Sequence, residues 1–423
     1  MELPQVPSSS SKFSLKWLKP HKRGLPSYSG RFAVGTFDVE SPKTETGLPG
    51  VLFRAFYPAD PSCIRKFRKA QWSPSINHVA AYGEGWGLSG SVSSIVLPIL
   101  FSPRSAAFFK APLLSGDERL PIVIFSHGLV GNRSSYSTLC GEIASHGFVV
   151  IALEHRDHSA ILSQIGGDAG THLKYIRRRG STPEALWKWR VEQQNLRAQE
   201  VAAAIEALRN MDTGRTIFNY LGDTPTWFES RLDFNNMVMM GHSFGGFTAL
   251  SVTQTTNPFK CAVFIDTWFW YAALHGIDHL LKDHPTYNND VTIPFLFISS
   301  ENFHEAENLA AVQKLFNNPT RKEDSIHSLI LGSRHHNASD FLCIAPLTLW
   351  LIGLGGAADP RDVLRTQTDC ILAFVSRHVR LPENLRLLPS NEALLTGKGG
   401  SRNVSVGFQH VIPKKHTRRT SMA

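Results

Sequence analysis

The chain has 423 residues, of which 42% are hydrophobic and 19% are charged, and this composition excludes a disordered or fibrous protein. The 44 Lys and Arg residues exceed the 35 Asp and Glu residues, and the net charge of +9 is compatible with nucleic acid, with an anionic membrane surface or with solubility alone. The 5 cysteines are scattered without a Cys-x-x-Cys pair, so the sequence predicts neither a disulfide framework nor a cysteine zinc site and favours a reducing compartment.

Both ends of the chain are basic. Residues 1–24 lack the apolar run of a secretory signal, and Glu2 stands where N-terminal myristoylation needs glycine. Because no apolar run of about 18 residues is present, we expect no transmembrane helix. The missing signal and the scattered cysteines lead us to expect a cytoplasmic protein that can bind membranes peripherally. The predicted organisation is a flexible basic extension over 1–29, a folded domain over 30–396 and a disordered basic tail over 397–423.

Short apolar runs recur along the middle of the chain and predict strands. They lie at 51–58, 121–128, 148–155, 238–243, 262–266, 294–300 and 325–332. Several are almost continuous in Val, Ile, Leu and Phe, which is typical of strands covered on both faces. Helices are predicted between them, over 134–145 and from Pro183 to about Arg209. The pattern indicates one α/β domain with a mostly parallel central sheet and helices on both faces.

Two further segments are unusually apolar. Residues 86–112 contain aromatic residues and two prolines with little charge, and residues 346–354 follow a pair of histidines. Both are too short or too interrupted to span a bilayer. Each is compatible with a core helix and with a segment that dips into a lipid surface.

The motif Gly241-His242-Ser243-Phe244-Gly245 matches G-x-S-x-G and stands between a predicted strand and a predicted helix. This strand-turn-helix context is that of a nucleophile elbow, in which flanking glycines permit the sharp turn that exposes the serine hydroxyl. The alternative is a glycine-rich turn with a buried serine. We therefore take Ser243 as the candidate nucleophile.

A serine nucleophile needs a base and an acid, which follow it in this chain order in the α/β-hydrolase fold. Asp266 ends one predicted strand and Glu301 follows another, so either is a candidate acid. His335 and His336 follow a third strand and are both candidate bases. The residues alone leave these alternatives open.

The reaction also needs two backbone N–H groups that stabilise the oxyanion. Phe244, the residue after the candidate nucleophile, supplies the first. The predicted strand at 121–128 continues into a glycine-rich loop, in which Leu129 is the candidate for the second. The alternative is that His127 and Gly128 only form a tight turn.

Five blocks of the sequence resemble, in the same order, the platelet-activating factor acetylhydrolases of the group VII phospholipase A2 family. They are FSHGLVGNRSSYS (125–137), ASHGFVVIALEHRDHSA (144–160), GHSFGGFTAL (241–250), AVFIDTWFW (262–270) and GSRHHNASDF (332–341). The resemblance covers most of residues 30–355. It implies an α/β-hydrolase fold with Ser243, Asp266 and His335 as the triad and with the oxyanion hole at the backbone of Leu129 and Phe244. Without a secretory signal, the chain resembles the intracellular branch of the family. Members of that branch carry a myristoylation glycine, which is missing here.

The resemblance also implies an activity. In such enzymes the sn-2 ester of phospholipids with acetyl, short or oxidised acyl chains is hydrolysed without Ca²⁺ or another cofactor, and the sequence has no EF-hand loop and no HExxH motif. The family docks on lipid through two apolar patches, which correspond by position to segments within 86–112 and 346–354. Trp268 and Phe269, just after the acid, are expected in the acyl pocket unless they are ordinary packed aromatic residues.

Two rival functions stay open at this point. A general carboxylesterase or polyester hydrolase uses the same fold and triad on a soluble ester. A non-catalytic lipid-binding protein is the other alternative, and the oligomeric state is not predicted. No helix-turn-helix, zinc-finger or RRM pattern is present, so we expect no nucleic-acid partner.

Overall fold

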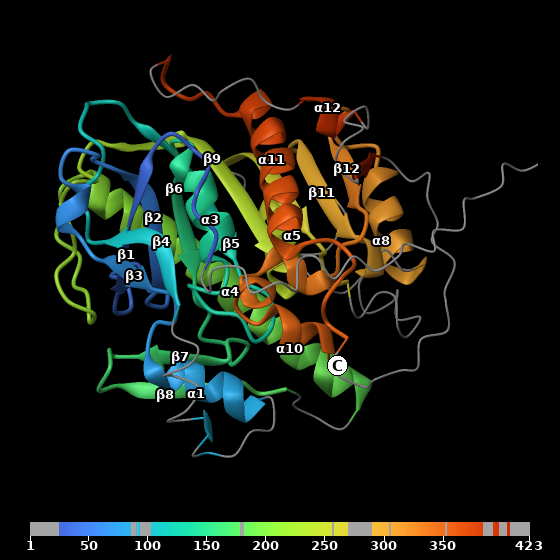
Figure 1. Cartoon of the computed structure of the whole chain (residues 1–423), viewed down its shortest axis with the longest axis horizontal. Helices are drawn as coiled ribbons and strands as arrows, with labels where there is room; N and C mark the ends of the chain where they lie inside the picture. Colours follow the sequence, from blue (N-terminus) through green and yellow to red (C-terminus); the bar gives the residue numbers. More distant parts are fainter. Residues whose placement is uncertain are drawn as a thin grey trace, which may run out of the picture.

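The computed structural model describes residues 25–85, 90, 92–93, 103–177, 182–255, 258–269, 290–303, 306–351, 353–383, 392–396 and 404–406. Their strands form an 11-stranded sheet with the order β13-β12-β11-β10-β9-β5-β6-β2-β1-β4-β3, and a separate pair, β7-β8 (Figure 1). The six strands β6, β5, β9, β10, β11 and β12 are parallel to one another. The centre of the sheet is therefore parallel, as the sequence predicted.

The strands have the following bounds: β1 (Ala33–Glu40), β2 (Leu52–Ala59), β3 (Lys69–Gln71), β4 (Arg104–Phe109), β5 (Leu120–Ser126), β6 (Val149–Leu153), β7 (Leu162–Ile165), β8 (Thr171–Lys174), β9 (Leu232–His242), β10 (Phe259–Ile265), β11 (Phe295–Ser300), β12 (Ile326–Ile330) and β13 (Val404–Val406). The α-helices are α1 (Ile76–Gly85), α3 (Ser137–Ser145), α4 (Pro183–Asp212), α5 (Phe244–Thr255), α8 (Ala306–Phe316), α9 (Phe341–Ile344), α10 (Pro346–Leu351), α11 (Pro360–His378) and α12 (Glu392–Leu395).

The core lies on both faces of the sheet because successive side chains of its strands point in opposite directions. In β6, Val149 and Ile151 belong to a cluster that contains side chains of α4, α5 and α8. Val150 and Ala152 of the same strand belong to a second cluster, which contains side chains of α3, α11 and α12. Both faces of the central strands are thus covered by helices, which explains their continuous apolar sequences.

All seven predicted strands are present in the structure, and so are the two helices predicted between them and the helix predicted after the G-x-S-x-G motif, which is α5. The second helix, α4, continues to Asp212, and its first turn is capped by Thr182, whose side chain accepts a hydrogen bond from the N–H of Ala185 at 3.2 Å. The first helix, α3, begins at Ser137 instead of residue 134. The strands that the sequence did not predict are β1, β3, β4, β7, β8 and β13.

Two predictions about apolar and terminal segments need correction. Within the apolar segment 86–112, Arg104–Phe109 form β4, which pairs with β1 and β3, so this part belongs to the sheet. Residues 86–89, 91 and 94–102 of that segment lie outside the described residues. Within the predicted tail, Val404–Val406 form β13, antiparallel to β12, whereas the rest of the tail lies outside the described residues.

A small accessory unit lies beside the main sheet, next to the ends of its strands. The helix α1 and the β7-β8 hairpin lie beside one another there (Figure 1). Trp72, Tyr82, Ile161 and Leu162 join them in a buried cluster. Among the described residues, no helix is both long and apolar enough to cross a membrane.

Candidate active site

Ser243 occupies a sharp turn between β9 and α5. Its φ is +57°, a left-handed conformation that is rare for a residue with a side chain. A Cβ at Gly241 would lie 2.0 Å from the carbonyl oxygen of Gly245, and a Cβ at Gly245 would lie 2.1 Å from that of Ser126. The turn therefore requires both glycines of the motif, as a nucleophile elbow does.

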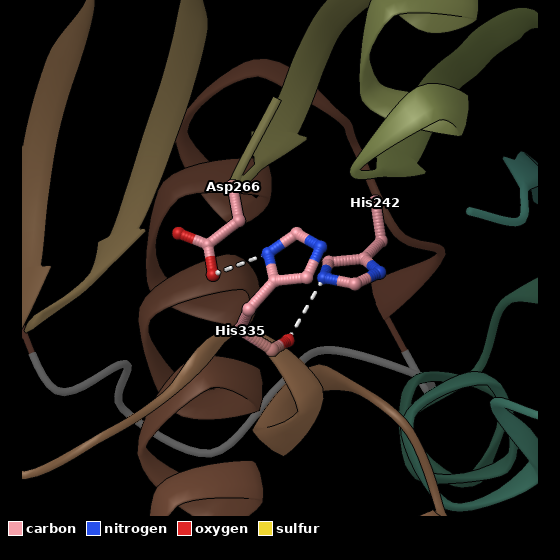
Figure 2. Close-up of side chains that lie close together, drawn as sticks. All are labelled: His242, Asp266 and His335. Atoms are coloured by element: carbon pink, nitrogen blue, oxygen red, sulfur yellow. Dashed lines mark hydrogen bonds and ion pairs between the residues drawn. The ribbon is translucent and has the colours of Figure 1, made fainter. Parts of the chain in front are cut away.

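His335 and Asp266 meet Ser243 at the carboxyl edge of the parallel strands. The Oγ of Ser243 is 2.9 Å from Nε2 of His335, and Nδ1 of His335 is 3.3 Å from Oδ2 of Asp266. Figure 2 shows the carboxylate of Asp266 facing the ring of His335. The geometry allows the serine hydroxyl to donate to the imidazole while the carboxylate accepts from its other nitrogen, which is the arrangement of a Ser-His-Asp triad.

The local backbone holds these groups in register. Asp266 follows β10 with a φ of +42°, and its N–H donates to the carbonyl oxygen of Ile298 in β11 at 2.8 Å. The N–H of Trp268 donates to the carbonyl oxygen of Ser243 at 3.0 Å. The turn that carries the acid is thereby tied to the elbow that carries the serine.

The two alternatives for the acid and the base have other contacts. Oε2 of Glu301 accepts a hydrogen bond from the N–H of Gly332 at 2.5 Å, so this carboxylate closes a turn next to the site. The ring centroids of His336 and His335 are 5.6 Å apart. Burial, with the nearby charges of His335 and Arg334, lowers the pKa of His336 to about 3, so this side chain is neutral near pH 7.

Three residues near β11 contact the candidate triad, and sequence reasoning missed all of them. Ser300 donates from its N–H and from its hydroxyl to the carboxylate of Asp266, both at 2.6 Å. Asn302 accepts from the N–H of His335 at 2.8 Å. The ring of Phe303 stacks on the ring of His335, with centroids 4.2 Å apart and 20° between the planes. The available signal was the position of Ser300 at the end of a strand, since polar residues at strand ends meet at one sheet edge.

The loop after β5 carries the candidate oxyanion residue Leu129. A Cβ at Gly128 would lie 3.0 Å from Cβ of Ser243, so the backbone of this loop packs against the serine. Nδ1 of the buried His127 donates to the carbonyl oxygen of Gly128 at 2.6 Å, and Nε2 accepts from the N–H of His155 at 3.1 Å. Burial, with the nearby charge of Arg197, lowers the pKa of His127 well below the usual value, so the ring stays neutral.

A buried arginine links this loop to the start of α5. Nη1 of Arg197 donates to the carbonyl oxygen of His127 at 2.9 Å, and its guanidinium lies 4.5 Å from the ring centroid of Phe244. Nε of Arg197 pairs with Asp157 at 2.8 Å, which compensates its burial. The two segments that carry the candidate N–H donors thus share one support.

The two aromatic residues after the acid differ in their surroundings. The ring of Trp268 packs edge-on against that of Phe244, with centroids 6.1 Å apart, and so lies beside the elbow. Phe269 is buried in the core, stacked on Phe297 at 6.0 Å. Only Trp268 has contacts that fit a pocket next to the serine.

The segment 346–354 is partly buried. It contains the short helix α10, in which Leu349 is 3% exposed and packs with Leu342 and Ala345. Residue 352 lies outside the described residues. The side chain of Leu349 is thus part of a small core instead of a lipid-facing surface.

His242, Asp266 and His335 have nitrogen and oxygen atoms within 4.8 Å of one another, which is close enough to consider a metal site. Both nitrogens of His335 already contact Ser243 and Asp266. Both nitrogens of His242 also have partners, the hydroxyl of Tyr136 at 2.8 Å and the carbonyl oxygen of His335 at 3.0 Å. The donor set therefore fits a hydrogen-bonded network better than a metal centre.

Comparison with known proteins identifies the family. The family described as "Platelet-activating factor acetylhydrolase, isoform II" matches residues 18–392. The chain belongs to this family. The platelet-activating factor acetylhydrolase of Gallus gallus is 31% identical over 84% of this chain and 84% of its own length. That of Cavia porcellus is 28% identical over 85% of this chain and 79% of its own length.

The fold has a counterpart among solved structures. A ferulic acid esterase from Streptomyces cinnamoneus superimposes with a TM-score of 0.60, covering 91% of this chain and 99% of the esterase, at 15% identity. The mostly parallel sheet and this likeness identify the α/β-hydrolase fold. Together with the family, they make this chain an ester hydrolase.

Proposed function

We propose that this protein is a Ca²⁺-independent serine hydrolase that cleaves the sn-2 ester of platelet-activating factor and of related phospholipids with short or oxidised acyl chains. The products are a lysophospholipid and a free acid. The observation that carries the proposal is the hydrogen-bonded series from Ser243 through His335 to Asp266, at 2.9 and 3.3 Å, in a chain of this family.

In the first half of the proposed reaction, Oγ of Ser243 attacks the sn-2 carbonyl carbon and its proton passes to Nε2 of His335. The N–H groups of Leu129 and Phe244 stabilise the resulting oxyanion. The bond to the glycerol oxygen then breaks, and His335 returns the proton to that oxygen. The lysophospholipid leaves, and the acyl group stays on Ser243.

In the second half, His335 takes a proton from a water molecule, which attacks the carbonyl carbon of the acyl-enzyme. The bond between the acyl group and Oγ of Ser243 then breaks, His335 returns the proton to Oγ, and the free acid leaves. Asp266 stabilises the imidazolium that forms at each proton transfer, and Ser300 holds its carboxylate in place at 2.6 Å. The neighbouring His336 and His242 are neutral, because burial lowers the pKa of both. The positive charge of the reaction is therefore confined to His335.

The substrate and its delivery belong to the same proposal. Trp268, which packs beside Phe244, is assigned to the wall of the acyl pocket. Peripheral contact with a phospholipid surface is assigned to segments within 86–112, before β4, and within 346–354, apart from the buried Leu349. No cofactor takes part in the reaction, and we place the protein in the cytoplasm.

The proposal is tested by labelling and by a substrate series. A fluorophosphonate probe should label the parent protein and fail to label Ser243→Ala. Phosphocholines that differ only in the length of the sn-2 acyl chain should be hydrolysed fastest with acetyl and other short chains. Activity that rises steadily toward long unoxidised chains contradicts the substrate assignment.

The nearest alternative is a general carboxylesterase that uses the same serine. Rates on a soluble monomeric ester and on a short-chain phospholipid, measured below and above micelle formation, separate the two. A gain in rate above micelle formation supports the phospholipase. An equal preference for the soluble ester assigns a general esterase, and persistent labelling of Ser243→Ala removes the serine mechanism altogether.

A further inference from the structure

The residue between Gly241 and Ser243 in the motif is His242, and its side chain contacts the proposed base. Nε2 of His242 lies 3.0 Å from the backbone carbonyl oxygen of His335. The two rings are 4.5 Å apart between centroids, with 36° between their planes. Figure 2 shows this contact beside the pair of Asp266 and His335. Because a carbonyl oxygen only accepts, Nε2 of His242 is the donor.

The other nitrogen of His242 reaches toward the oxyanion loop through a tyrosine. Nδ1 of His242 is 2.8 Å from the hydroxyl of Tyr136, and the same hydroxyl accepts from the N–H of Gly128 at 3.2 Å. Nδ1 carries no proton when Nε2 carries one in the neutral ring, so the tyrosine donates to it. A continuous series of hydrogen bonds therefore runs from Gly128 through Tyr136 and His242 to the carbonyl of His335.

The series is well protected from water. His242 is 3% exposed and Tyr136 is 5% exposed. Burial, followed by the charges of His335 and His336, lowers the pKa of His242 well below its usual value. His242 therefore stays neutral when His335 takes up a proton, and both of its hydrogen bonds persist through the reaction.

We propose that Tyr136 and His242 are positioning residues that form a hydrogen-bonded strut between the oxyanion loop and the base. Gly128 directly precedes Leu129, and the carbonyl of His335 belongs to the residue that carries the imidazole. The strut thus fixes the distance between the group that receives the proton and the site where negative charge develops. This inference rests on the proposed serine hydrolase mechanism.

Rate depends strongly on such distances because the oxyanion donors act only when they are aimed at the developing charge. Loss of the strut leaves each part of the site present but loosely spaced. The expected signature is a lower kcat with little change in KM, since the ground-state contacts of the substrate are kept.

Two substitutions remove different hydrogen bonds of the strut. Tyr136→Phe keeps the ring and removes the hydroxyl that joins Gly128 to His242. His242→Asn keeps an acceptor near the position of Nδ1 and removes the donor to His335. The matched control is Tyr57→Phe, which removes a buried hydroxyl that donates to the carbonyl of Ala111 at 2.7 Å. Tyr57 lies on β2, which β5 and β6 separate from β9 in the sheet.

The experiment measures kcat and KM of the full-length variants on a soluble acetyl ester, with thermal unfolding as a check of folding. Each strut variant should lower kcat about 10-fold with KM within about 2-fold of the parent. The kcat of the double variant should also be about 10-fold lower than that of the parent, because both substitutions remove the same series of hydrogen bonds. If the two residues acted independently, kcat would be about 100-fold lower. Tyr57→Phe should keep the parental kcat.

Two results overturn the strut. One is a kcat of Tyr136→Phe within about 2-fold of the parent, and the other is an effect of about 100-fold in the double variant. If His242→Asn does not fold, the kcat of Tyr136→Phe compared with that of Tyr57→Phe is sufficient to test the strut. Ser243→Ala tests the proposed mechanism separately. Full activity of this variant would contradict the mechanism. If Ser243→Ala is inactive and Tyr136→Phe keeps the parental kcat, only the strut is contradicted.

Discussion

Asp266 is the residue around which the support of the proposed base is built. Its carboxylate accepts two hydrogen bonds from Ser300, and its Oδ2 also faces Nδ1 of His335. A carboxylate with this many donors is held in one orientation. In the proposed mechanism, Asp266 can therefore stabilise the imidazolium without moving.

The choice between the two candidate acids leads to the first prediction. Asp266→Asn should lower kcat about 10⁴-fold, because the amide favours the wrong tautomer of the imidazole. Glu301→Gln keeps an acceptor for the N–H of Gly332 and should lower kcat less than about 10-fold. Steady-state kinetics on a soluble ester measure both variants. A larger loss in Glu301→Gln than in Asp266→Asn would exchange their roles.

The residues of the proposed triad could be predicted because each follows a predicted strand in the chain order of the fold. Ser300, Asn302 and Phe303 could not. Their contacts depend on the position of β11 between β10 and β12. The order of strands in a sheet cannot be predicted from the local sequence pattern of each strand. The sequence drew attention to Glu301 in the same segment, although its carboxylate contacts Gly332.

At the scale of elements, the elbow is a close contact between β5 and the start of α5. The carbonyl oxygen of Ser126, the last residue of β5, would be 2.1 Å from a Cβ at Gly245 in the first turn of α5. Both partners are backbone, so neither can rotate away. Any side chain at this position must push the helix and the strand apart.

The second prediction follows from this contact. Gly245→Ala should lower the free energy of unfolding by about 3 kcal/mol, the upper end of the usual cost of overpacking. It should also lower kcat, because β5 leads directly into the oxyanion loop. Urea unfolding and kinetics on a soluble ester are the measurements.

The matched control for this variant is Gly47→Ala. Gly47 has a φ of +90° but no atom within 4 Å of the position of a Cβ. Its substitution should cost only the backbone strain, about 1 kcal/mol, and leave kcat unchanged. Equal costs at the two glycines would mean that α5 and β5 move apart freely.

The elements that sequence patterns predicted well are those buried on both faces. β5, β6, β10 and β11 consist mainly of apolar residues because helices cover them on both sides. β1 mixes Gly35, Thr36 and Asp38 with its apolar residues, and β3 and β13 have only 3 residues each. Such strands are defined by their partners in the sheet more than by their own sequences.

At the scale of the whole molecule, the fold buries several ionisable groups that respond to pH in opposite directions. Burial lowers the pKa of His127 and His242 well below the usual value, and it raises the pKa of Glu200 and of Asp340 to about 7. The lowered histidines make the fold less stable as the pH falls, whereas the raised carboxyls make it less stable as the pH rises. The total pH dependence of stability therefore mixes both signs.

The third prediction isolates His242 from this mixture. Its pKa in the folded state lies below the unfolded value of about 6.5, so its stabilising contribution is complete above that pH and is lost as the pH falls. Asparagine does not titrate. The stability of the parent relative to His242→Asn should therefore decrease by up to about 1.4 kcal/mol for each pH unit below 6.5. Urea unfolding of both proteins between about pH 7.5 and 5.5 measures it. A constant difference over this interval would mean that His242 accepts a proton in the folded state.

The shortness of the outermost strands has a consequence for how copies of this chain behave at high concentration. In the described part of the chain, the sheet ends at β3 (Lys69–Gln71) on one side and at β13 (Val404–Val406) on the other, each 3 residues long. A long exposed edge is a template on which another chain adds its own strand, and a short edge offers few free N–H and C=O groups for this. Both ends of this wide sheet thus discourage aggregation by edge-to-edge pairing, and loss of β13 would expose the longer β12 to it.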